Sequence, residues 1–113
     1  MFTSPFHNGP TPSYPPRDGD ISPWGQIQTV HDVLYGIVFV TTARHGGFLL
    51  SPERLRQMPE HLRSHDGWYE EDCEVALPMF VFYDEMEMMG MIDPQRQPKT
   101  DIVGEIRRLG LEV

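Results

Sequence analysis

The fold of this chain is decided between residues 27 and 50, which read IQTVHDVLYGIVFVTTARHGGFLL. Valine, isoleucine, threonine and aromatic residues dominate the stretch. Two breaks divide it, one at Tyr35-Gly36 and one at Arg44-His45-Gly46-Gly47. Glycine supplies the positive φ that tight turns need. The pattern therefore predicts three antiparallel strands, at about Gln26–Val33, Ile37–Ala43 and Gly47–Leu50.

The middle strand of the three is apolar on both faces. Because side chains alternate along a strand, Ile37 and Phe39 point to one side while Val38 and Val40 point to the other. A strand that is apolar on both faces is usually covered on both. We therefore expect it to be the central strand of the sheet.

Helix signals follow the strands. Ser51 can cap a helix, and Pro52 suits its first position, so the sequence predicts a helix over Pro52–Arg63 that bends at Pro59. A second helix is expected to open at about Tyr69, because the carboxylates that follow it favour the positive end of a helix dipole. Pro78 is expected to kink or end this second helix.

The C-terminal segment predicts a third helix. Thr100 can cap it, an apolar face recurs at helical spacing, and Gly110 can take the left-handed stop conformation. The apolar face either completes the core of its own chain or forms a dimer contact. Its residues are Ile102, Val103, Ile106 and Leu109.

The chain divides into a tail and one domain. Six prolines in residues 1–23 remove backbone donors and disfavour both helix and sheet. The remaining residues, 24–113, are enough for a single core. We therefore predict an α+β fold, with a short antiparallel sheet of about three strands covered by two to three helices, behind a proline-rich N-terminal tail.

Negative charge is concentrated in one segment. Between Arg63 and Arg96 there are nine carboxylates and no lysine or arginine, in a chain whose formal net charge is −8. Proteins that bind the phosphate backbone directly carry basic stripes and a high pI. One lysine and a pI near 4.9 disfavour that class of function, and we expect no direct contact with nucleic acid.

Cys73 is the only cysteine, which excludes an intramolecular disulfide and is typical of a reducing compartment. The N-terminus lacks a basic segment followed by an apolar one, and no apolar run is long enough to span a membrane. These features predict a cytoplasmic protein without a membrane partner.

Several short motifs stand out in the middle of the chain. They are Trp24-Gly25, Gly36-Ile37-Val38, His45-Gly46-Gly47, Leu50-Ser51-Pro52-Glu53-Arg54 and Gly67-Trp68-Tyr69-Glu70-Glu71-Asp72-Cys73-Glu74. Together these motifs resemble an uncharacterised domain found in proteins of phages, plasmids and integrative elements. The resemblance covers roughly Trp24–Phe82, and it implies a mobile-element setting and no particular reaction.

Aromatic residues beside clustered carboxylates are typical of surfaces that bind arginine-rich partners. In a mobile-element protein, this favours a binding protein that blocks the basic nucleic-acid site of a host defence complex, as anti-CRISPR proteins do. We predict no catalytic residue, cofactor or metal for such a role. The predicted partner-binding residues are Trp68, Tyr69, Glu70, Glu71, Asp72, Glu74, Asp84, Glu85 and Glu87.

Two other functions stay open. The first is a small enzyme that uses His45 with Glu70, Glu71, Asp72 or Cys73, although neighbouring carboxylates oppose formation of a thiolate. The second is an oligomeric structural or regulatory module, such as a homodimer, assembled through the methionine-rich stretch Met86–Met91 and the C-terminal segment. A metal site is a further alternative: the four-residue spacing of His61 and His65 would place both imidazoles on one side of a helix, and Glu70, Glu71 or Asp72 could add oxygen ligands.

Overall fold

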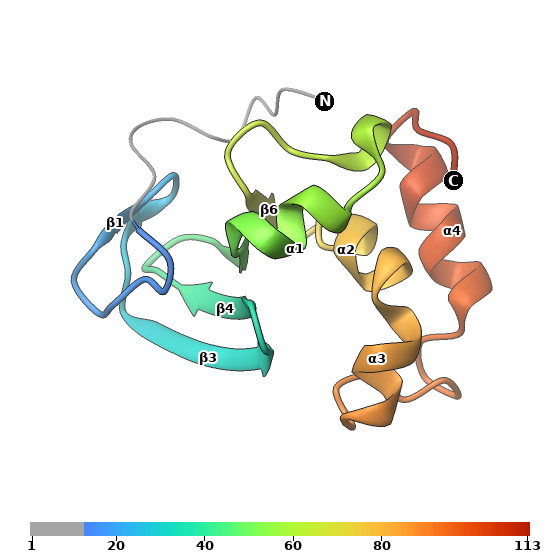
Figure 1. Cartoon of the computed structure of the whole chain (residues 1–113), viewed down its shortest axis with the longest axis horizontal. Helices are drawn as coiled ribbons and strands as arrows, with labels where there is room; N and C mark the ends of the chain where they lie inside the picture. The colour runs from blue at the N-terminus through green and yellow to red at the C-terminus, as the bar shows by residue number, and fades with distance from the viewer. Residues whose placement is uncertain (1–12) are drawn as a thin grey trace.

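The structure, a computed structural model, describes residues 13–113 (Figure 1). It is an α+β fold, as predicted, with a four-stranded antiparallel sheet, a separate two-stranded ribbon and several helices. The strands are β1 (Ile21–Ser22), β2 (Gly25–Gln26), β3 (Thr29–Leu34), β4 (Ile37–Thr41), β5 (Gly46–Leu50) and β6 (Trp68–Glu70). The helices are α1 (Pro52–Gln57), the 3-10 helix η1 (Glu60–Leu62), α2 (Ala76–Val81), α3 (Tyr83–Met88) and α4 (Lys99–Arg108).

The four-stranded sheet has the order β3-β4-β5-β6, and every neighbouring pair is antiparallel. The three strands predicted from residues 27–50 are all present. β4 is interior, as expected, and its two faces contribute to different apolar clusters: Ile37 to one and Val38 with Val40 to the other. The alternation of side chains along a strand therefore places this sheet between two cores.

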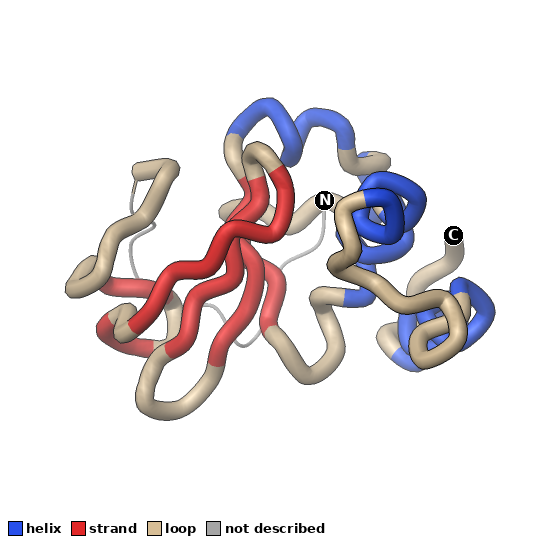
Figure 2. Tube along the Cα trace, turned by 90° about the horizontal axis from the view of Figure 1, so that it is seen from below, coloured by secondary structure: helices blue, strands red, loops and turns tan. Residues whose placement is uncertain are grey.

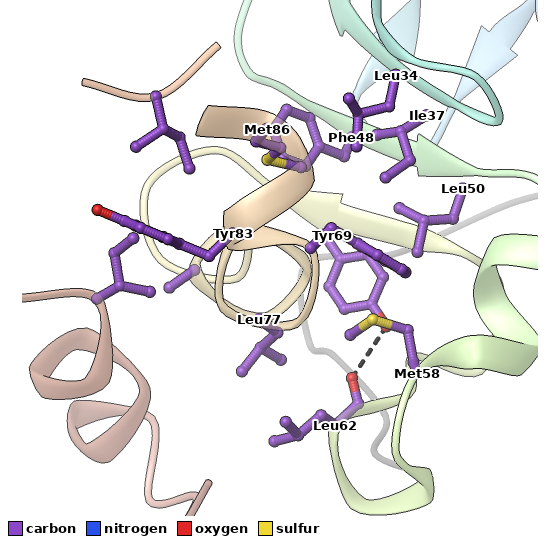
Figure 3. Close-up of a cluster of buried hydrophobic side chains, with 14 of the residues drawn as sticks. Leu34, Ile37, Phe48, Leu50, Met58, Leu62, Tyr69, Leu77, Tyr83 and Met86 are labelled. Carbon is purple, nitrogen blue, oxygen red and sulfur yellow. Dashed lines mark hydrogen bonds between the residues drawn. The ribbon is translucent and has the colours of Figure 1, made fainter. Parts of the chain in front are cut away.

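The helices lie to one side of the sheet and the β1–β2 ribbon lies to the other (Figures 1 and 2). On the helical side, Phe48 and Tyr69 from the sheet pack with Leu77, Met86 and other helical residues. Figure 3 shows this cluster, with Tyr69 at its centre. Burial of this face against helices is the principal source of stability for so small a domain.

The ribbon side holds a smaller core. Trp24, in the β1–β2 turn, packs edge-to-face on Trp68 of β6 with ring centroids 5.3 Å apart. The hydroxyl of the buried Ser22 accepts a hydrogen bond from the Trp24 amide at 3.1 Å and donates one to the Gly25 carbonyl at 2.8 Å. These bonds fix the turn that carries Trp24. Of the predicted tail, residues 1–12 lie outside the described residues.

The sixth strand corrects one prediction. A helix was expected to open at about Tyr69, but Trp68–Glu70 instead forms β6, paired with β5. Tyr69 lies opposite Phe48 in that pairing. Aromatic side chains suit a pleated sheet, and β5 is apolar on both faces, so long-range pairing outweighs the local preference of the carboxylates for a helix start. The chain becomes helical only at Ala76.

Pro78 does not kink or end a helix, contrary to expectation. It is the third residue of α2, which continues to Val81. Residues in the first turn of a helix have no partner for their amide within the helix, so proline costs little there. The interruption comes instead at Phe82, between α2 and α3.

The helix predicted after Ser51 is present. The Ser51 hydroxyl accepts a bond from the Arg54 amide at 3.2 Å, and the helical path bends at Pro59 before η1. In α4, the predicted cap is wrong. Pro98 precedes the helix and Thr100 lies inside it, because Pro98 excludes helical backbone before it and leaves the next residue to begin the helix.

The apolar face of α4 packs within its own chain. Ile102 and Ile106 are buried in the main core, and α4 contacts α2 (Figure 1). Gly110 has φ of 79°, and the Leu111 amide returns to the Ile106 carbonyl at 3.3 Å. The predicted glycine stop is therefore confirmed. None of the helices formed by residues 13–113 has the length and apolar character needed to cross a bilayer.

Candidate functional site

His45 ends the tight turn between β4 and β5. The Thr42 hydroxyl donates to the His45 carbonyl at 2.7 Å and accepts from the His45 amide at 3.2 Å. It also accepts from the Arg44 amide at 3.2 Å. The Thr42 side chain therefore fixes the backbone of the turn at Arg44 and His45. The imidazole of His45 remains exposed.

The two glycines after His45 are required by close packing. A Cβ atom on Gly47 would lie 2.3 Å from the Tyr69 carbonyl oxygen and 2.5 Å from the Trp24 ring. A Cβ atom on Gly46 would lie 2.6 Å from the Val40 carbonyl oxygen. Neither glycine has a positive φ, so the expectation that they supply left-handed turn conformations is wrong. Gly47 instead allows Trp24 and β6 to approach β5, and Gly46 allows close contact with the Val40 carbonyl and the Glu71 carboxylate.

The pairing of β5 with β6 brings the His45 turn to the carboxylates. Gly47 lies opposite Glu70, so the same register continued by two residues places His45 opposite Asp72. The ligand atoms of these three side chains, one nitrogen and two carboxylate oxygens, all lie within 4.8 Å of one another.

Glu70 is a buried acid in this cluster, with 3% of its surface exposed. Its Oε2 accepts from the Asp72 amide at 2.6 Å, and its own amide donates to Oε1 of Glu74, which is also buried, at 3.0 Å. Burial raises the pKa of the Glu70 carboxyl, and repulsion from Asp72 and Glu74 adds to that effect. The bond from the Asp72 amide and the nearby His45 act in the opposite direction.

The raised pKa of Glu70 gives a prediction for stability. The folded protein retains a proton that the unfolded chain releases, so the contribution of Glu70 to stability should decline as pH rises through the folded pKa. Glu70→Gln removes the charge but keeps an acceptor for the Asp72 amide. We expect this variant to have a higher free energy of unfolding than the wild type at neutral pH, and a flatter dependence on pH.

Urea unfolding between about pH 4 and about pH 8, in the presence of a chelator, measures this effect. Glu60→Gln provides the control, because Glu60 is exposed in η1 and is not part of the group formed by His45, Glu70 and Asp72. A Glu70→Gln protein that is less stable than the wild type at about pH 8 would mean that the surroundings favour the charged carboxylate.

Cys73 is half-buried in the turn between β6 and α2. The helix expected to open at about Tyr69 would have contained Cys73, but no helix forms there, because β6 occupies the preceding residues. Burial raises the pKa of the Cys73 thiol, and the carboxylates of Glu70 and Glu74 raise it further. Both effects oppose formation of a nucleophilic thiolate at neutral pH.

Trp68 and Tyr69 are fully buried. The Tyr69 hydroxyl donates to the Leu62 carbonyl at 2.9 Å, as Figure 3 shows, and accepts from the Ser64 amide at 2.9 Å. Burial raises the pKa of Tyr69 to about 12. These two aromatics therefore form the core and fix the segment after η1. They do not present a surface to a partner in this conformation.

The predicted partner-binding acids are divided between two places. Glu70 in β6 and Glu74 after it are buried, Glu71 is half-buried beside Gly46, and Asp72 is exposed. The remaining three, Asp84, Glu85 and Glu87, are exposed on α3.

Glu85 is the member of the α3 group that has a basic partner. Arg54 donates from both terminal nitrogens to its carboxylate, at 2.8 and 2.6 Å, and this pairing lowers the pKa of Glu85. The same guanidinium donates to the Tyr35 carbonyl at 2.7 Å and lies over the Phe82 ring, 5.0 Å from its centroid. Arg54 thus connects α1, the β3–β4 turn and α3.

A pocket of about 640 Å³ lies beside this connection. Its walls come from the end of β3 and the β3–β4 turn, the start of α1, the segment around Tyr14 and the chain after α3. Apolar side chains dominate the lining, and two carboxylates, Asp32 and Glu53, are also part of it. The apolar lining includes Tyr14, Val33, Tyr35, Met89 and Met91.

The histidines at positions 61 and 65 do not form a shared site. His61 lies in η1 and its Nε2 is 2.7 Å from the Glu112 carbonyl oxygen. His65 lies in the following loop, with Nε2 3.5 Å from Asp66 Oδ2. The expected helical spacing does not apply, because η1 ends at Leu62. Glu70 of β6 and Asp72 are grouped with His45 instead.

Sequence reasoning grouped His45 with Glu70 and Asp72 as an enzyme alternative, and the structure brings these three together. The sequence patterns did not indicate the pocket or the role of Arg54. The pocket combines residues from distant segments, so no local pattern indicates it. The only local signal was the run of methionines after Tyr83, which is typical of adaptable surfaces.

Residues 17–105 match a family model described as a domain of unknown function, DUF7007. The description names no activity, ligand or partner. No curated protein and no solved structure matches the chain significantly.

Proposed function

This chain belongs to the DUF7007 family of unknown function, and we propose that it is a binding protein that docks on a basic surface of another protein. The proposed target is the nucleic-acid-binding site of a bacterial defence complex, so the protein would act in the manner of an anti-CRISPR inhibitor. The observation that carries the proposal is the exposed acidic helix α3, which continues into exposed methionines beside a mainly apolar pocket that includes two carboxylates.

Charge supports a basic partner. Asp84 and Glu87 are exposed on α3, and among residues 13–113 no lysine or arginine forms a salt bridge with either. Arg54 neutralises Glu85 only. Exposed carboxylates without partners raise the local negative potential and attract a cationic surface during encounter. Further carboxylates, Asp32 and Glu53, lie in the pocket beside them.

Apolar surface next to these charges supports binding to a protein segment. Met88 is 84% exposed, and Met89 and Met91 are exposed where they line the pocket. Methionine is flexible and polarizable, so it can pack against partner side chains of different shapes. A Lys/Arg-rich segment that carries an apolar anchor would satisfy both the pocket and its carboxylates.

A nucleic-acid-binding channel is the class of basic surface that this arrangement fits best. Its lysines and arginines are spaced to contact successive phosphates, and carboxylates on consecutive helical turns can occupy similar positions. The resemblance of this chain to a domain of mobile genetic elements supports a target in host defence. By this mechanism, the protein excludes DNA or RNA without contacting nucleic acid itself.

The test is inhibition of purified CRISPR effector complexes of several types. We expect a near-equimolar amount of the protein to block DNA binding by at least one of them, measured by gel shift. Inhibition should weaken as salt rises, because exposed charges are screened. Asp84→Lys combined with Glu87→Lys should weaken it by at least tenfold, since like charges would then face each other.

Asp18→Lys combined with Glu60→Lys is the matched control, because it changes net charge equally at two exposed positions outside α3. It should inhibit as the wild type does. The proposal fails if no effector is inhibited, or if both double variants behave alike. Inhibition of a large molar excess of effector, lost in His45→Ala, would instead favour an enzyme that uses the His45 cluster.

A further inference from the structure

Three metal-binding side chains converge where the β4–β5 turn meets the end of β6. His45, Glu70 and Asp72 offer one nitrogen and two oxygens, all within 4.8 Å of one another. Ligands that each lie about 2.1 Å from one metal ion are roughly 3 to 4 Å apart. His45 and Asp72 are exposed, so small rotations of their side chains can close the remaining distance.

The cluster is held by the fold. Glu70 is buried, and the Asp72 amide donates to its Oε2 at 2.6 Å. Among the described residues, that amide is the only group that donates a hydrogen bond to the Glu70 carboxylate. The Thr42 hydroxyl fixes the backbone of His45 at both its amide and its carbonyl. Supporting bonds of this kind position the ligands of metal sites.

The charges at this place are unbalanced. The carboxylates of Asp72 and Glu74 repel that of Glu70, and His45 is the group that attracts it. Glu70 is buried, with 3% of its surface exposed. Buried carboxylates are normally paired with a cation or coordinate a metal, because an isolated buried charge is costly. A divalent cation between His45, Glu70 and Asp72 would supply the missing positive charge.

We propose that His45, Glu70 and Asp72 bind one divalent transition-metal ion of the Zn²⁺ or Mn²⁺ class. Imidazole nitrogen together with carboxylate oxygen suits these ions, whereas Mg²⁺ and Ca²⁺ are bound mainly by oxygen. Three protein ligands leave at least one position open to water, since His45 and Asp72 lie at the surface. Such a site is accessible to solutes.

Bound metal would have a structural effect that is independent of the proposed docking on a basic partner. It would join the β4–β5 turn to the segment that connects β6 with α2. The exposed carboxylates of α3 belong to a different part of the chain and are absent from this ligand group. Metal binding and docking on a basic partner are therefore separable, and each can fail without the other.

Titration of tag-free, full-length protein with Mn²⁺ alone and with Zn²⁺ alone tests the site, by calorimetry and, for Mn²⁺, by electron paramagnetic resonance. We expect one ion per chain, and much weaker binding of Mg²⁺. His45→Gln and Asp72→Asn should each weaken binding by at least tenfold, because each removes one of only three ligands. His31→Gln, at an exposed position on β3, should bind as the wild type does.

A second measurement does not depend on variants. In nuclear magnetic resonance spectra, substoichiometric Mn²⁺ should broaden the amide signals of residues 45 and 70–72 before those of residues 84–88. Absence of one-to-one binding would overturn the proposal, as would unchanged affinity in His45→Gln. Preferential broadening over residues 84–88 would also overturn it, since the ion would then be attracted by exposed carboxylates alone.

Discussion

Ile106→Asp is expected to unfold the protein at room temperature. Ile106 is fully buried on the inner face of α4, in the main core. The substitution removes an apolar side chain from that core and buries a carboxylate there without a hydrogen-bond or ion-pair partner. The two changes together lower the free energy of unfolding by about 5 kcal/mol or more. Small domains are stable by about 5–15 kcal/mol, so most or all of the stability would be lost. Circular dichroism and urea unfolding measure the result.

Met88→Asp is the control for this prediction. It introduces the same charge at a side chain that is mostly exposed on α3, and should change stability by about 0.5 kcal/mol or less. A folded Ile106→Asp protein would contradict the packing of α4 on its own chain. If the wild type were also dimeric and this variant monomeric, the apolar face of α4 would form an interface between two copies.

Local sequence patterns were sufficient for the strands between Thr29 and Leu50 and for most of α4. In these segments the apolar periodicity and the turn residues indicate the same structure. β6 is different. The run after Tyr69 has the carboxylates of a helix start, and only pairing with β5 makes it a strand. Pairing partners lie far away in sequence, so a local pattern cannot predict their effect.

The same limitation applies to the functional surface. Nine carboxylates in one acidic segment suggested one binding face, but β6 buries Glu70 and Glu74 and leaves Asp84 and Glu87 exposed on α3. Charge along the chain indicates how much negative potential the protein carries. Whether a given carboxylate reaches solvent depends on whether it lies in or beside a buried strand. Tyr35 and Met89 likewise share a pocket only because the β3–β4 turn lies near the end of α3.

Gly47→Ala tests the close contact that produces the His45 cluster. The added Cβ would lie 2.3 Å from the Tyr69 carbonyl oxygen and 2.5 Å from the Trp24 ring. The carbonyl oxygen belongs to the backbone of β6, so it can move only if the strand moves with it. Overpacking of this severity costs about 3 kcal/mol or more. We expect a correspondingly lower urea midpoint, together with a change in near-ultraviolet circular dichroism as Trp24 and Trp68 separate.

Gly104→Ala makes the same chemical change at a place where the opposite result is expected. Gly104 lies within α4, and a Cβ there would meet nothing within 4 Å. Alanine is favoured over glycine inside a helix, so this variant should be more stable than the wild type by about 0.5–1 kcal/mol. Opposite signs for the two substitutions would assign the cost at Gly47 to contact with β6 and Trp24. Equal stability of Gly47→Ala and the wild type would mean that β5 and β6 do not approach this closely, and the convergence of His45 with Glu70 and Asp72 would fail with it.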